Sequence, residues 1–168
     1  MTRQKLLNIY LADHLAGAVI GQELAKRSLS SNRETELGTF LSGLLSEVDE
    51  DRRTLESVID SVGAQPDRLK MGAGWLSEKA GRLKLNGQLR GYSDLSRLVE
   101  LEGLCAGVEG KKSLWISLKG LQDSDARLQS FDFGALESRA QQQREGLEVH
   151  RRAAASTAFS GRDAPAGR

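Results

Sequence analysis

The feature that most constrains the fold of this chain is a helical repeat of apolar residues. Residues 34–62 show it most clearly, because apolar side chains recur there at alternating spacings of four and three residues. One acid, Asp51, occupies a place in that apolar series. Pro66 and Pro165 are the only prolines among the 168 residues, and runs of β-branched and aromatic residues are few. The sequence therefore predicts an all-α protein.

The same repeat divides the chain into four long helices and a polar tail. We expect the helices over residues 4–29, 34–62, 93–120 and 132–157. Residues 1–158 are expected to form a single helical-bundle domain, because no internal repeat and no second set of elements is visible. Residues 159–168 are small and polar, which predicts a disordered C-terminal tail.

The segment between the second and third long helices, residues 64–91, is expected to contain a helix of its own. Pro66 suits the first turn of a helix, and Leu69, Leu76 and Leu83 recur along one side of the chain that follows. A helix of roughly 18 residues would be about 27 Å long at 1.5 Å per residue. It would be long enough to run the length of the bundle, so we expect a crossover helix over about residues 66–85.

This layout resembles that of ferritin-like proteins, in which two antiparallel helical hairpins are joined by one long crossover. The resemblance covers about residues 4–158 and implies a ferritin-like four-helix bundle with an additional crossover helix. The di-iron members of that superfamily carry Glu-x-x-His on two helices. The present chain departs from that motif, because Leu11 and Leu147 stand three residues before His14 and His150.

Each expected long helix carries at least one possible metal ligand among apolar or small residues. On a wheel of 100° per residue, His14, Asp51 and His150 fall inside such arcs. Glu102 and Glu109 lie seven residues apart on one face of the third helix. Because a buried carboxylate is costly unless it is paired, hydrogen-bonded or bound to a metal, we expect these side chains to meet in the core. Carboxylates together with imidazoles suit Fe or Mn.

Two glycine pairs interrupt the helical pattern. Gly17 and Gly21 lie four residues apart in the first helix, as do Gly103 and Gly107 in the third. Each glycine costs about 1 kcal/mol in a helix interior relative to alanine. The pairs therefore suggest close approach of the first helix to the third, and the alternative is a locally weakened helix that the fold tolerates.

Charge and composition exclude several classes of function. The chain has 24 Lys and Arg against 23 Asp and Glu, so a net charge of +1 provides no general attraction to nucleic acid. No stretch approaches the roughly 18 uncharged apolar residues of a membrane span. Cys105 is the single cysteine, which fits a protein of the reducing cytoplasm. No nucleophile motif and no phosphate-binding loop is visible.

Two hypotheses of function follow from these observations. The first is a non-catalytic bundle that associates with itself or with a protein partner, and whose buried polar residues form a network that sets helix register. The second is an Fe- or Mn-binding protein with a storage or redox role, in which the metal ligands are His14, Asp51, Glu102, Glu109 and His150.

Overall fold

The computed structural model describes residues 1–64 and 92–160. Its long helices are α1 (Arg3–Ser31), α2 (Glu36–Ser61), α4 (Asp94–Lys119) and α5 (Phe133–Phe159). Two short 3-10 turns, Gln122–Ser124 and Ala126–Leu128, connect α4 to α5. No strand occurs in these two described ranges, so the prediction of an all-α fold is confirmed. The expected helix over 66–85 lies outside the described residues, and so does the tail from residue 161 onward.

The ends of the helices follow local sequence signals. Each long helix begins after a residue whose side-chain oxygen accepts a hydrogen bond from a backbone N–H in the first turn, and these residues are Thr2, Thr35, Ser93 and Asp132. Such a bond satisfies a donor that the helix itself leaves without a partner. After α2 the chain turns at Gly63, whose φ of 66° favours glycine.

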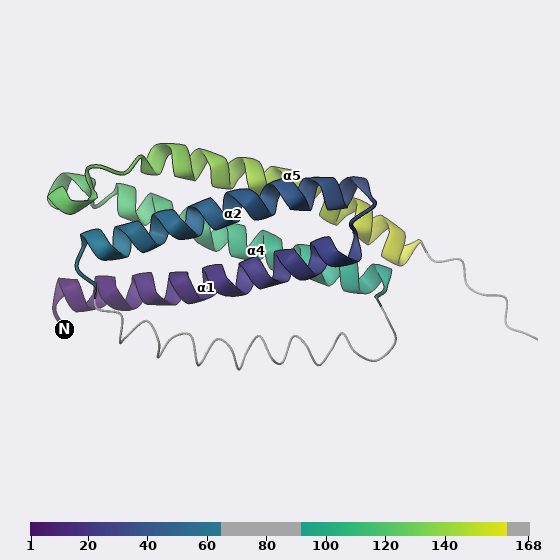
Figure 1. Ribbon diagram of the computed structural model, residues 1–168, viewed down its shortest axis with the longest axis horizontal. Helices are drawn as coiled ribbons and strands as arrows, with labels where there is room; N and C mark the ends of the chain where they lie inside the picture. Colours follow the sequence, from purple (N-terminus) through teal and green to yellow (C-terminus); the bar gives the residue numbers. More distant parts are fainter. Residues whose placement is uncertain (65–91, 161–168) are drawn as a thin grey trace, which may run out of the picture.

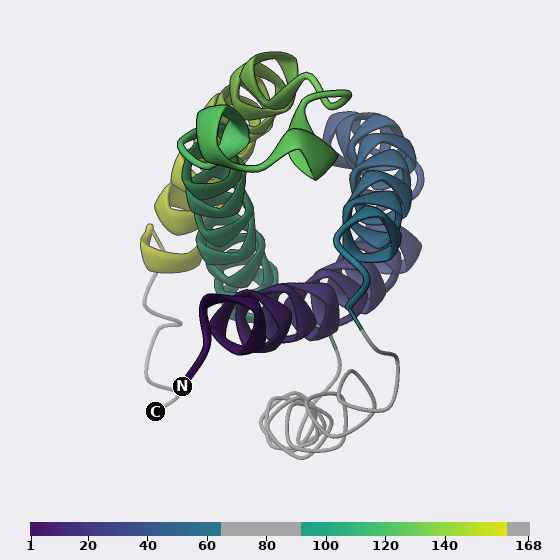
Figure 2. The same ribbon diagram turned by 90° about the vertical axis from the view of Figure 1, so that its left-hand side faces the viewer.

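The helices pack as two antiparallel hairpins (Figure 1). The first hairpin is α1 with α2, and the second is α4 with α5. The end of α2 and the start of α4 lie at opposite ends of the bundle, so α2 and α4 run in the same direction. Seen along the bundle, α1 lies between α2 and α4, and α5 packs beside α4 (Figure 2). Direct packing between α2 and α5 is sparse.

The core is built mainly from leucine, with one aromatic cluster near the 3-10 turns. Leu11, Leu41 and Leu147 are fully buried, and each comes from a different helix. Trp115 stacks on Phe133, with 6.0 Å between the ring centroids. None of the described helices is both long enough and apolar enough to cross a membrane.

Candidate functional site

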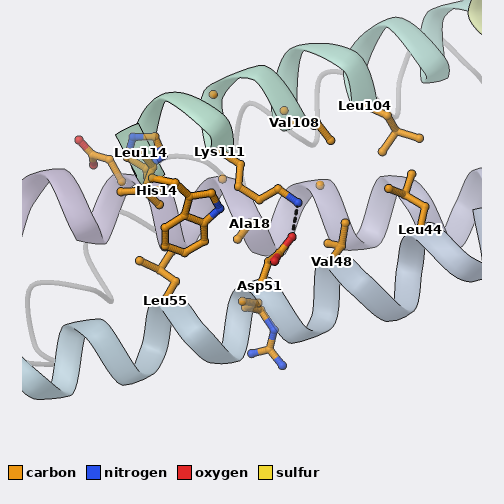
Figure 3. A pocket seen from close by; sticks show the side chains of 17 residues that line it. His14, Ala18, Leu44, Val48, Asp51, Leu55, Leu104, Val108, Lys111 and Leu114 are labelled. Carbon is orange, nitrogen blue, oxygen red and sulfur yellow. Dashed lines mark hydrogen bonds and ion pairs between the residues drawn. The ribbon is translucent and has the colours of Figure 1, made fainter. Parts of the chain in front are cut away.

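A cavity of about 220 Å³ lies between α1, α2 and α4, and its walls are largely apolar (Figure 3). Leu44, Val48 and Leu104 form part of these walls. Asp13 and Gly17, which also line the cavity, are exposed residues. The cavity therefore reaches solvent along the line where α1 faces α4.

Glycines create this cavity. A Cβ atom added at Gly17, Gly21 or Gly107 would meet no other atom within 4 Å. The interpretation of these glycines as points of close helix approach is therefore wrong. Only Gly103 has the expected contact, because a Cβ there would lie 2.9 Å from Cδ2 of Leu24 on α1. The missing side chains leave space between α1 and α4 that a tight interface would have filled.

Two polar residues of the cavity wall, Asp51 and Lys111, belong to a buried ion-pair network centred on Asp51. Only 2% of the Asp51 surface is exposed, and its carboxylate accepts hydrogen bonds from Lys111 of α4 and Arg139 of α5. Gln143 Nε2 also approaches one of the carboxylate oxygens, at 3.4 Å. The Lys111 ammonium extends across the cavity toward Asp51 (Figure 3). The network thus joins α2 to α4 and also to α5, which α2 otherwise scarcely touches.

Further polar groups complete this network at its edge. Arg139 donates to Glu50 Oε2 at 2.7 Å, and Gln143 Nε2 donates to Glu47 Oε2 at 2.8 Å. Lys111 Nζ also donates to Gln143 Oε1. Burial lowers the pKa of Lys111 below its ordinary value, although the charge of Asp51 opposes this shift.

His14 contributes the imidazole at one end of the same cavity. Its ring is half-buried and contacts Tyr10 edge to face, with 4.5 Å between the centroids. Burial lowers the pKa of His14, and the carboxylate of Asp13 opposes this shift. A half-buried imidazole with a lowered pKa is neutral at pH 7. His14 and Asp51 are the two predicted ligands that line one cavity.

Glu102 and Glu109 are exposed, so the prediction that they face the core is wrong. The Glu109 side chain is 51% exposed and forms an ion pair with Lys112 at 2.8 Å. The cause of the error is that α4 carries apolar residues around most of its circumference, so a helical wheel does not distinguish its core face. The acid of α4 that is buried is Glu100.

His150 does not line the cavity and packs against an aromatic ring instead. Its half-buried ring lies against Phe40, with 4.7 Å between the centroids. Over residues 1–64 and 92–160, no three or more His, Cys, Asp or Glu side chains come together in a way that would hold a metal ion. The structure therefore does not bring the five predicted ligands together, and Asp51 has cationic partners instead.

Sequence reasoning missed both cations of the network. A signal for Lys111 was available, because it follows Leu104 by seven residues and Val108 by three. Those spacings place Lys111 on the same side of α4 as two core residues. Arg139 had no comparable signal, since it lies at the edge of the α5 apolar stripe and reaches Asp51 through its long side chain.

A second polar network ties the turn between α1 and α2 to the start of α4. Glu100 accepts from Arg27 Nε at 2.8 Å and from the hydroxyl of Tyr92 at 3.2 Å. The Tyr92 hydroxyl accepts in turn from Asn32 Nδ2 at 2.8 Å. Burial raises the pKa of Tyr92, as does the adjacent Glu100 carboxylate. The buried Glu100 carboxylate therefore has its hydrogen-bond partners within the protein. We infer a structural role for this network, which holds the helix ends together.

The chain matches no family model, no curated protein and no solved structure.

Proposed function

We propose that this protein is a ferritin-like helical bundle without a catalytic centre, which binds a small apolar molecule in the cavity between α1, α2 and α4. The ferritin-like assignment is supported by the parallel direction of α2 and α4. That direction requires one long connection between two antiparallel hairpins, which is the layout of the superfamily.

The size and the chemistry of the cavity carry the proposal of ligand binding. Apolar cavities of about 150 Å³ in other proteins accept benzene, so a volume of about 220 Å³ has room for a somewhat larger molecule. A ligand that fills the space would remove the apolar part of the cavity wall from water, which favours binding. The exposed lining residues Asp13 and Gly17 supply a path for its entry.

The residues around Asp51 favour this function over metal binding. Lys111 and Arg139 both donate to the Asp51 carboxylate, so a metal ion at Asp51 would have to displace or adjoin two cationic side chains. Binding of Fe or Mn through His14, Asp51, Glu102, Glu109 and His150 stays a prediction. Elemental analysis of protein purified without an affinity tag tests it, and stoichiometric Fe or Mn would support it.

Ligand binding can be tested with indole and benzene as probes. We expect both to raise the melting temperature of the full chain, and benzene, which does not emit in the tryptophan range, to change the fluorescence of Trp115, which lines the cavity. Gly107→Leu should abolish both effects, because its side chain would extend into the cavity. Gly43→Leu is a matched control, since Gly43 is also a helix glycine with no atom near an added Cβ and does not line this cavity.

Two results would contradict the proposal. One is the absence of binding by wild type at the solubility limit of both probes. The other is equal binding by wild type and Gly107→Leu, which would place the probes elsewhere on the protein. Association with itself or with a protein partner stays a separate prediction, and sedimentation velocity over a range of concentrations measures it.

A further inference from the structure

Among the described residues, one amine stands in the otherwise mainly apolar lining of the cavity, and it belongs to Lys111. The Lys111 side chain is 15% exposed and comes from the middle of α4. We propose that Lys111 is a covalent attachment site for small apolar aldehydes, which the protein captures as imines. This inference rests on the proposed function, since the apolar part of the aldehyde would occupy the same cavity.

Lys111 can lose one proton without losing either of its hydrogen bonds. Within the described residues its Nζ has two acceptors, Asp51 Oδ2 and Gln143 Oε1. An ammonium group has three N–H donors, whereas a neutral amine has two donors and one lone pair. Two acceptors therefore satisfy the neutral amine fully and leave its lone pair unused. A free lone pair on a nitrogen that lines the cavity can attack the carbonyl carbon of a bound aldehyde.

The charges around Lys111 suit a protonated imine. Arg139 of α5 donates both to Asp51 and to Glu50, so it does not by itself balance the acids of the network. Glu47 lies at the edge of the same network, hydrogen-bonded to Gln143. A protonated imine keeps the positive charge of the Lys111 ammonium, so the pairing with Asp51 survives the reaction.

The reaction needs no oxidant, reductant or other reactant besides the aldehyde. Asp51, which is hydrogen-bonded to Nζ, is placed to take one proton from the Lys111 ammonium. The freed lone pair attacks the carbonyl carbon, and a second proton moves from nitrogen to oxygen to give a carbinolamine. Asp51 then gives its proton to the hydroxyl, which leaves as water. The products are one protonated imine and one water, with Asp51 as the counter-ion.

Reductive trapping identifies the site of reaction. The full chain is incubated with hexanal and sodium cyanoborohydride at neutral pH, and alkylated lysines are mapped by peptide mass spectrometry over time. We expect Lys111 to be labelled at least about tenfold faster than Lys5, Lys26 or Lys119, because the cavity holds the aldehyde beside its amine. Excess indole should slow labelling of Lys111 only, because it competes for the cavity.

Variants separate the reactive amine from the cavity. Lys111→Met should lose the fast labelling and still bind indole, whereas Lys112→Met, a neighbouring control, should keep both. Gly107→Leu should lose both. If all lysines of the wild type are labelled at equal rates, and the wild type binds indole in the melting assay, the imine is overturned and the cavity function stands. If the wild type does not bind indole and its lysines are labelled uniformly, both the imine and the ligand-binding function are overturned. These two results come from the wild type, so they do not depend on whether a variant folds.

Discussion

Replacement of Asp51 by alanine provides the sharpest test of the buried network. The substitution removes a carboxylate that accepts hydrogen bonds from Lys111, Arg139 and Gln143. Breaking a buried ion pair by removal of one partner costs about 3–5 kcal/mol, because the other charge is left without compensation. Here Arg139 retains Glu50, and Lys111 retains Gln143 and can lose its proton. We therefore expect a loss near the lower limit, about 3 kcal/mol.

Urea denaturation followed by circular dichroism measures this loss. With an m-value of about 2 kcal/mol per M, a loss of about 3 kcal/mol lowers the midpoint by roughly 1.5 M. Glu50→Ala is the matched control, because Glu50 is a 61% exposed acid on the same helix with the same Arg139 partner. That substitution should cost less than about 1 kcal/mol, as solvent screens an exposed pair.

A double variant tests whether the loss comes from a buried charge that is left without its partner. Asp51→Leu combined with Lys111→Met replaces the pair by apolar side chains of similar size, and such replacements are often neutral or stabilising. We expect the double variant to be more stable than Asp51→Leu alone by at least about 2 kcal/mol. A cost of Asp51→Ala below about 1 kcal/mol, or a double variant no more stable than Asp51→Leu, would show that the buried pair does not stabilise the fold in this way.

Three further predictions concern other parts of the molecule. Burial lowers the pKa of His14, so the unfolded chain binds a proton more readily than the folded chain, and the free energy of unfolding should fall as the pH decreases below about 6.5. His14→Phe should flatten this part of a stability–pH curve. Tyr92→Phe should cost about 1–2 kcal/mol in thermal denaturation, since it removes the hydroxyl between Asn32 and Glu100, and an unchanged melting temperature would contradict that role. Residues 66–85 are predicted from the sequence to be a helix packed on the bundle, so limited proteolysis should spare residues 69–83, and rapid cleavage there with the remainder intact would indicate a flexible linker.

Local sequence signals specify the four long helices of the described residues. The repeat of four and three residues, the scarcity of proline and the capping residues all act within a few turns of the chain, so they can be read without any knowledge of the fold. The burial of Asp51 also followed from its place in an apolar series. The same local reasoning placed His14 on the inner side of α1, where it lines the cavity.

Packing between the helices decides which polar residues meet. The face of α4 that enters the core was chosen by packing against α1 and α5, which buried Glu100 and left Glu102 and Glu109 in solvent. The partners of Asp51 come from helices 60 and 88 residues away in the chain, and one of them reaches it through a long side chain. Whether the glycines of α1 and α4 close an interface or open a cavity depended on the distance between two helices. A helical repeat specifies the face of each helix but not that distance, because the separation is set by all the side chains packed along the interface.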